Sequence, residues 1–178
     1  MFMPVTPTTR ALLGAVIGVI VSTSPVAAQR PTSAQALATA TAFLEALATV
    51  EDGGAAKLTA GRFFAVVRDD AEPAPRCGAT TATTPFARSA LLACLASQDL
   101  GTESLGAWKK ASRRKLNGPL AGMDMSRIAQ LERTATLVTR HTPCVGQGAD
   151  LIVAVTVEKG SRTPVVAAVL AQSYVCGE

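Results

Sequence analysis

The sequence has few aromatic residues and few of the residue types that most often carry catalysis. Phe, Trp and Tyr make up 4% of its 178 residues, and His141 is its one histidine. It contains no C-x-x-C pair, nucleophile elbow, phosphate-binding loop, metalloprotease helix or EF-hand motif. These absences argue against the enzyme classes that such motifs define, and the sequence predicts no cofactor and no metal site.

The sequence also lacks an apolar run of the length that a transmembrane helix needs, which is roughly 20 residues. The N-terminal run covers residues 11–21 and is then interrupted by the polar and proline residues 22–25. Arg10 is the only charged residue in the first 28, and the small residues 26–28 suit a signal peptidase. We therefore predict a secretory signal peptide over residues 1–28; an uncleaved N-terminal anchor is the alternative.

A strong net charge is absent as well. The formal net charge is +4, and it becomes +3 when Arg10 is removed with the signal peptide, which is too little to predict nucleic-acid binding. The remaining residues 29–178 have the length of one domain with a sizeable core. We expect an exported protein, periplasmic or extracellular, that folds as a single domain and binds no nucleic acid.

Cysteines are few, but all of them follow the predicted signal peptide. They are Cys77, Cys94, Cys144 and Cys176. An even number of cysteines in an exported chain favours disulfide bonds, and four cysteines allow three pairings. The alternative is a metal or redox site, but no two of these cysteines are closer than 17 positions. Because zinc sites usually supply their cysteines in close pairs, we predict two structural disulfides.

The last two apolar runs of the chain predict a β-hairpin. Gly160-Ser161 fits a two-residue type II′ turn, which places Val155 opposite Val166. The same register predicts that Ala168 and Leu170 share the face of Val155. Both faces of these strands are apolar in the middle, so we expect both to be covered, or one of them to line a cavity.

The register of this hairpin also suggests which cysteines pair. Extended along both strands, it brings Cys176 to within one residue of the position opposite Cys144, and a β-bulge would correct the offset. The disulfide Cys144–Cys176 is therefore geometrically plausible, and Cys77–Cys94 would then follow by elimination, although the sequence does not establish which of the three pairings forms. The first of these bridges would hold the free end of the terminal strand in place.

Residues 29–178 alternate between helical and strand-like patterns. The predicted elements are helices over 34–50 and 55–60, a strand over 62–68, a helix that Thr84 caps and Pro85 begins, a short turn or helix near 124–133, and strands over 134–141, 150–158 and 163–175. Consecutive strands at the end favour an antiparallel sheet over a parallel βαβ arrangement. The expected fold class is α+β, with N-terminal helices packed on a curved antiparallel sheet and a C-terminal β-hairpin.

This order of elements resembles the NTF2-like superfamily. The residues that carry the resemblance are "SAQALATATAFLEALATVEDGGAAKL" as the first helix, "RFFAVV" as the early strand, and "TATLVTRH", "ADLIVAVTVE" and "PVVAAVLAQSYV" as the terminal strands. The resemblance implies a cone of curved sheet around the N-terminal helices, although that family has more aromatic residues around its pocket. Its members include isomerases, dehydratases, hydrolases and non-catalytic binding modules, so the resemblance leaves the activity open.

Residues 101–122 form a variable basic segment in the middle of the chain. Within it, "SLGAWKKASRRKL" predicts an amphipathic helix with basic residues beside one aromatic. The candidate residues for binding an anion or a partner are Trp108, Lys109, Lys110, Arg113, Arg114 and Lys115. Such a cluster could bind an anionic polymer, phospholipid headgroups or an acidic protein. The alternative interpretation is a solvated helix face.

His141 is the one candidate for acid/base catalysis, and it lies at the end of a predicted strand. Its candidate carboxylate partners are Asp69, Asp70 and Asp124, none of which the sequence places close to it. Asp69-Asp70 could also bind a cation, but we interpret this pair as part of a solvated turn. The alternative role for His141 itself is that of an exposed residue at a strand end.

The leading hypothesis is an exported, disulfide-stabilised, non-catalytic module that binds a small apolar ligand or a protein partner. The alternative is a small pocket enzyme, an isomerase or hydrolase of the NTF2-like kind, that uses His141 and a carboxylate such as Asp124. It predicts His141 inside a concave site, within hydrogen-bond reach of a carboxylate. A third hypothesis uses the basic segment for adhesion to an anionic surface.

Overall fold

The computed structural model describes most of the chain that follows the predicted signal peptide. The described ranges are 30–49, 53–69, 71–72, 74–78, 81–109, 125–145 and 147–175. Outside them lie the predicted signal peptide, Asp70, Lys110, Arg113, Arg114, Lys115, Asp124, Cys176 and the side chain of Cys144. Within the described ranges, no helix has both the length and the apolar character to cross a membrane.

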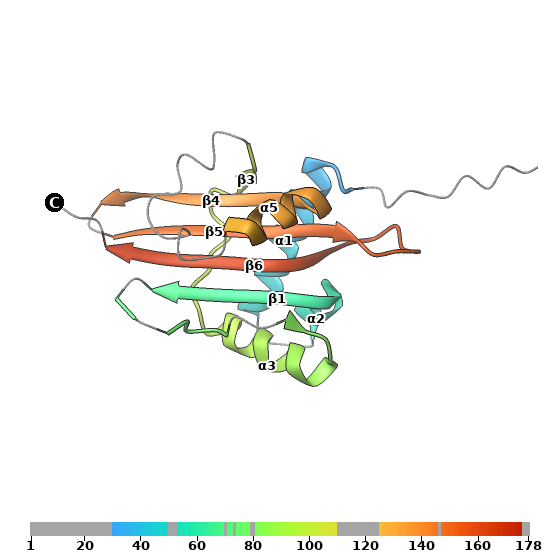
Figure 1. Ribbon diagram of the computed structural model, residues 1–178, viewed down its shortest axis with the longest axis horizontal. Helices are drawn as coiled ribbons and strands as arrows, with labels where there is room; N and C mark the ends of the chain where they lie inside the picture. The colour runs from blue at the N-terminus through green and yellow to red at the C-terminus, as the bar shows by residue number, and fades with distance from the viewer. Residues whose placement is uncertain are drawn as a thin grey trace, which may run out of the picture.

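Within these ranges, six strands form one sheet with the order β2-β1-β6-β5-β4-β3 (Figure 1). The strands are β1 (Thr59–Asp69), β2 (Thr81–Ala82), β3 (Gly106–Ala107), β4 (Thr136–Val145), β5 (Gln147–Val157) and β6 (Pro164–Val175). Strands β4, β5 and β6 are antiparallel neighbours in chain order, so the predicted C-terminal hairpin is confirmed.

The sheet is mixed, because β1 pairs with β6 in the parallel direction. The predicted antiparallel sheet is therefore confirmed for β4, β5 and β6, but the prediction is wrong for the pairing of β1 with β6. Between β1 and β6 the chain runs through helices and four other strands. A connection of that length can return a strand in either direction, whereas a short hairpin loop permits only the antiparallel one.

Helices cover both faces of the sheet, which confirms the α+β class. The helices are α1 (Ser33–Ala48), α2 (Gly54–Lys57), α3 (Pro85–Ala96) and α5 (Met125–Thr134). Figure 1 shows α5 in front of β4 and β5, with α1 crossing behind the strands. As predicted, Thr84 caps α3 with its hydroxyl, which accepts a hydrogen bond from the Ala87 N–H at 3.2 Å, and Pro85 takes the first helical position.

Each face of the sheet has its own apolar core. On the face toward α1 and α3, which we call the helix face, the alternating residues Leu151, Val153 and Val155 of β5 are buried. Ile152 and Ala154 point to the opposite face, which we call the α5 face. The expectation that both faces of the last strands are covered is confirmed.

The β5–β6 hairpin differs from the predicted one in its turn and in one register shift. The N–H of Ser161 donates to the carbonyl of Glu158 at 2.9 Å, and Gly160, with φ +84°, is the second central residue of this turn. The predicted type II′ turn, with Gly160 as its first central residue, is therefore wrong. The predicted pairing of Val155 with Val166 is nevertheless confirmed.

A β-bulge next to Val155 changes which residues of β6 share a face. Val155 faces Val166, but the preceding Ala154 faces Ala168, so one extra residue of β6 is accommodated. Ala168 and Leu170 consequently lie on the α5 face, whereas the unbroken register had predicted them on the face of Val155. A single bulge moves every following side chain to the opposite face.

Candidate functional site

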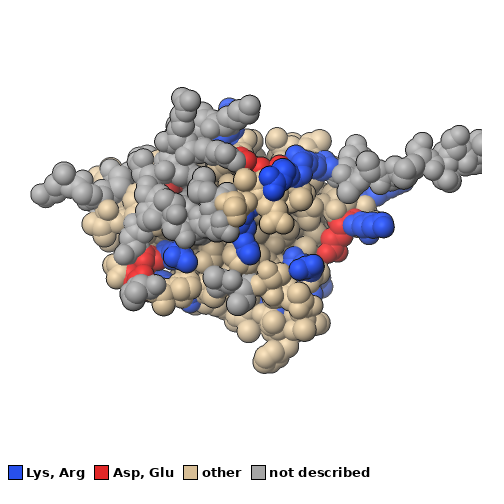
Figure 2. Space-filling view, in the orientation of Figure 1, with Lys and Arg blue, Asp and Glu red and all other residues tan. Residues whose placement is uncertain are grey.

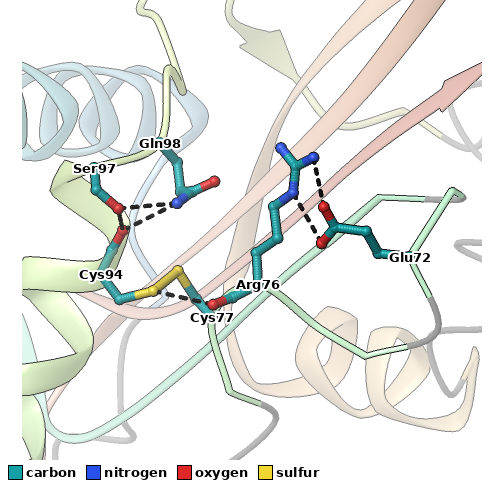
Figure 3. The surroundings of a disulfide bond; sticks show 6 residues. All are labelled: Glu72, Arg76, Cys77, Cys94, Ser97 and Gln98. Atoms are coloured by element: carbon teal, nitrogen blue, oxygen red, sulfur yellow. Dashed lines mark hydrogen bonds and ion pairs between the residues drawn. A yellow bond between two sulfur atoms is a disulfide. The ribbon is translucent and has the colours of Figure 1, made fainter.

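A disulfide joins Cys77 to Cys94 and ties the segment after β1 to α3 (Figure 3). Their Cα atoms are 5.8 Å apart, and Cys77 is almost fully buried. The backbone around Cys77 also pairs with β1, since the N–H of Val67 donates to the Cys77 carbonyl at 3.3 Å. The predicted bridge Cys77–Cys94 is confirmed; the bridge Cys144–Cys176 lies outside the described residues and stays a prediction.

Asp69 is part of an ion-pair cluster in that same segment. Arg76 lies 2.6 Å from the Asp69 carboxylate and 3.0 Å from that of Glu72. The backbone N–H of Ala71, together with Arg76, lowers the pKa of Asp69 below its usual value, so the carboxylate is ionised at neutral pH. Arg76 therefore balances the charge of Asp69, and the carboxylate found beside His141 is a different one.

A hollow of about 480 Å³ lies between the C-terminal ends of α1 and α3, and we call it the α1–α3 hollow. One wall is the last turn of α1 and the other is the segment 95–102, which ends α3 and continues beyond it. Its lining contains the buried residues Leu44, Leu47, Leu95 and Leu100. Glu45, Ser97, Gln98 and Asp99 supply polar groups to the same lining, so the hollow combines apolar and polar surface.

The wall that α3 contributes is fixed by local hydrogen bonds next to the disulfide (Figure 3). The Ser97 hydroxyl donates to the Cys94 carbonyl at 2.7 Å, and the Gln98 amide donates to the Ser97 hydroxyl at 2.9 Å. The backbone N–H of Ser97 also donates to the Cys94 carbonyl at 3.2 Å, so backbone and side-chain hydrogen bonds together close the end of α3. The disulfide at Cys94 thus holds the turn from which residues 95–102 begin.

His141 pairs with Asp150, which the sequence analysis did not propose. The two residues are direct cross-strand partners on β4 and β5, and Nδ1 of His141 lies 2.6 Å from Oδ1 of Asp150. The Asp150 side chain is 0% exposed and that of His141 is 23% exposed. Burial raises the pKa of Asp150, and the hydrogen bond with His141 offsets part of this effect.

The sequence did contain a signal for this pair. One predicted strand ended at His141 and the next began at Asp150, so the two residues bounded a single connection. Residues that flank the connection of a hairpin face each other across it, which would have made Asp150 the first carboxylate to consider. Asp124, the carboxylate that was proposed, lies outside the described residues.

The His141–Asp150 pair belongs to a row of four polar side chains across the sheet. Asp150 is the cross-strand partner of Gln172 on β6, and Gln172 is that of Arg68 on β1. Directly opposed residues share a face of a sheet, so the whole row lies on the α5 face. Asp150 and Gln172 are 1% and 3% exposed. We call Arg68, Gln172, Asp150 and His141 the polar row.

Trp108, proposed as part of a binding segment, packs against the protein itself. Its indole N–H donates to Glu132 of α5 at 2.7 Å, and its ring packs on the apolar core of the α5 face. Gly106 and Ala107 form β3 beside β4, so the amphipathic helix predicted from "SLGAWKKASRRKL" is wrong over this part. Lys109 is exposed, and the other basic residues of the segment lie outside the described ranges.

The described surface shows charges of both signs close together. In Figure 2, blue Lys and Arg side chains lie beside red Asp and Glu side chains over the part of this face that is coloured. In the described ranges, no group of three or more His, Cys, Asp or Glu side chains could hold a metal ion. The described part of this face therefore carries charges of both signs, and its described residues form no metal centre.

Comparison of the chain with protein-family models, with curated proteins and with solved structures found no match. The resemblance to the NTF2-like superfamily therefore stays a prediction that depends on the order of the elements. The described part of the molecule thus has two candidate sites, the α1–α3 hollow on the helix face and the polar row on the α5 face.

Proposed function

We propose that this protein is an exported, disulfide-stabilised binding module that holds a small apolar ligand in the α1–α3 hollow. The observation that carries the proposal is the hollow itself. Its volume of about 480 Å³ falls within the range of about 300–1,000 Å³ that small-molecule sites occupy. Its lining combines four buried leucines with a few polar groups, which is the composition typical of such sites.

The charges of the lining indicate what kind of ligand it favours. Glu45 and Asp99 place carboxylates on the hollow, and no lysine or arginine is among the described residues that line it. Carboxylates accept hydrogen bonds and repel anions. The ligand that fits best is a small apolar molecule with a hydrogen-bond donor, such as an amine; a protein segment presenting the same groups is the alternative occupant.

Two features support an exported location. The Cys77–Cys94 disulfide fits a compartment outside the reducing cytoplasm, and the N-terminal sequence has the pattern of a signal peptide. Non-reducing peptide mapping of protein recovered from the producing cells tests both. A start at Gln29 with an intact Cys77–Cys94 bridge would support export, whereas an intact Met1 with free thiols would contradict it.

The ligand proposal is tested by filling the hollow. The fluorescent arylamine N-phenylnaphthylamine serves as the probe, because it is apolar and carries one N–H donor. Ala48 lies on the hollow at an exposed position of α1, so Ala48→Trp fills the hollow without disturbing the core. We expect the wild type to bind the probe saturably and Ala48→Trp to bind it at least tenfold more weakly.

The control variant is Ala42→Trp, which adds the same side chain at an exposed position of the same helix outside the hollow. It should bind the probe like the wild type. Equal binding by the wild type and by Ala48→Trp would refute the hollow as the site. Absence of binding to the wild type, together with retention of a peptide or protein by the same surface, would favour a protein segment as the occupant.

Acid/base catalysis at His141 is the second candidate function, and the 2.6 Å contact with Asp150 favours it. A carboxylate that orients an imidazole is a recurring arrangement for a general base. The enzyme hypothesis also required a concave site around His141, and this residue does not line the α1–α3 hollow. Turnover of any ester, epoxide or ketone substrate that is lost in His141→Ala would replace the binding module with an enzyme.

A further inference from the structure

Two buried atoms of the polar row, one hydrogen-bond donor and one acceptor, have no hydrogen-bond partner in the described part of the chain. Nε of Arg68 is buried and has no hydrogen-bond partner there. Oδ2 of Asp150 is buried in the same way, while Oδ1 of that carboxylate is occupied by His141. A buried polar atom without a partner costs free energy, so both atoms favour a bound molecule that supplies the missing groups.

We propose that the polar row is a second binding site, for a small molecule that carries both a carboxylate and a hydrogen-bond donor, as amino acids and hydroxy acids do. The Arg68 guanidinium binds the carboxylate, because a planar guanidinium and a carboxylate form strong, charge-assisted hydrogen bonds. The ammonium or hydroxyl group of the ligand donates to Oδ2 of Asp150. One molecule thereby satisfies both unmatched atoms.

The spacing of the strands limits this ligand to a small one. Arg68 and Asp150 are both cross-strand partners of Gln172, so about two strand spacings, roughly 10 Å, separate their Cα atoms. The long side chain of Arg68 covers part of this distance. A ligand with a few bonds between its carboxylate and its donor covers the remainder.

The neighbouring rows on the α5 face give the site two different walls. On one side, Val66, Leu170 and Ile152 are cross-strand neighbours and belong to the apolar core of that face. On the other side, the Tyr174 ring lies over Gly148, where an added Cβ would come within 2.6 Å of the ring carbon Cζ. Gly148 is therefore required for the aromatic wall, which leaves the polar row between an apolar and an aromatic boundary.

Both ends of the row reach solvent. Arg68 is partly exposed, and the His141 side chain is 23% exposed, while Asp150 between them is buried. A ligand bound to Asp150 shares that carboxylate with His141, so it changes the environment of the imidazole. Because His141 is the only histidine of the chain, its two ring nitrogens give the only imidazole signals in an NMR spectrum.

The experiment is a titration of the ¹⁵N-labelled full chain, purified without a histidine tag and followed through the His141 imidazole signals. The probes are glycine, β-alanine and γ-aminobutyrate, which place the carboxylate and the ammonium at increasing separations. Acetate and ethylammonium each supply only one of the two groups. We expect a saturable shift with at least one of the three amino acids and none with acetate or ethylammonium at the same millimolar concentrations.

The variants test the two assigned contacts separately. Arg68→Gln and Asp150→Asn should each weaken binding at least tenfold, and Arg68→Lys should also weaken it because it loses the fork of donors. Arg62→Gln, an exposed arginine on the same strand, is the matched control and should bind like the wild type. Circular dichroism confirms that each variant is folded, and Arg68→Lys retains the charge should Arg68→Gln fail to fold.

The outcomes separate this proposal from that of the α1–α3 hollow. Ala48→Trp should leave the amino-acid titration unchanged, because Ala48 lies on the opposite face. The proposal is overturned if none of the three amino acids shifts the His141 signals, or if Arg68→Gln binds as tightly as Arg62→Gln. A shift with acetate alone that Arg68→Gln removes would also overturn it, because a simple anion site needs no donor for Asp150.

Discussion

On the helix face of the sheet, α1 and α3 pack on apolar side chains, and a disulfide fixes the edge of this layer. On the α5 face, a shorter helix covers a smaller apolar core, and a row of polar side chains crosses four strands beside it. Burial of apolar groups stabilises a fold, whereas burial of a carboxylate costs free energy. We infer that the helix face contributes most of the stability, and that the buried polar side chains of the α5 face serve binding rather than stability.

The largest expected effect comes from the helix face. Phe43 is fully buried, and its ring centroid lies 6.0 Å from that of Phe63 on the sheet. Phe43→Ala should lower the free energy of unfolding by about 4 kcal/mol, because it removes a whole aromatic side chain and leaves a cavity. Urea unfolding measures the change. Phe86→Ala, at a position 85% exposed, is the control and should change stability by less than about 0.5 kcal/mol.

The disulfide is the second test of the helix face. The bridge closes a loop with a sequence separation of 17, for which the loop-entropy model gives about 3 kcal/mol. The double variant Cys77→Ala/Cys94→Ala should lose about that much stability in urea unfolding. It should also bind the arylamine probe more weakly, because residues 95–102 begin next to Cys94. Unchanged stability in the double variant would contradict the assigned role of the bridge.

The third prediction concerns the α5 face and its dependence on pH. The folded-state pKa of Asp150 is raised above 3.8 because the carboxyl group is buried. The folded state therefore binds this proton more tightly than the unfolded state, and Asp150 lowers stability as the pH rises from near 3.8 through the folded-state pKa. Asp150→Asn cannot ionise and should lack this loss.

The measurement is thermal or urea unfolding of the wild type and of Asp150→Asn between acidic and neutral pH. The stability of the variant relative to the wild type should increase as the pH rises. A constant difference across this range would show that the carboxyl group titrates alike in the folded and unfolded states. A decreasing difference would show that the contact with His141 outweighs burial.

The smallest expected effect tests the start of α3, which packs on the helix face. The Thr84 hydroxyl accepts a hydrogen bond from the N–H of Ala87, so Thr84→Ala should cost about 1 kcal/mol of stability. Thr83 is exposed and precedes the cap, so Thr83→Ala is the matched control. Equal losses for the two variants would show that the cap does not stabilise α3.

Some parts of this structure follow from patterns that are local in the sequence. The helices near residues 34–50 and 85–96 and the C-terminal hairpin were predictable, because periodic apolar residues and a capping threonine act within a few residues. The bridge Cys77–Cys94 was also predicted, although by elimination, and it does join a loop to the helix that follows.

Other parts depend on which strands meet, and local patterns do not encode that choice. The parallel pairing of β1 with β6 joins segments about a hundred residues apart, so neither turn chemistry nor periodicity determines it. The bulge between Ala154 and Val155 reversed the predicted faces of Ala168 and Leu170. A one-residue shift of this kind leaves no signal in a run of similar apolar residues.

The sequence by itself determined the longer helices, the cap of α3 and the C-terminal hairpin, since each depends on neighbouring residues. It also provided four cysteines for disulfide bonds. The β4–β5 hairpin, whose strands are neighbours in the chain, brings His141 to Asp150. Only the tertiary structure decided that Arg68 and Gln172 continue the same row. It also decided that the ends of α1 and α3 enclose a hollow. The row depends on the pairing of β1 with β6, and the hollow depends on how α1 and α3 pack together. Both arrangements join segments that are apart in the sequence, and they are set when the two faces of the sheet are buried together.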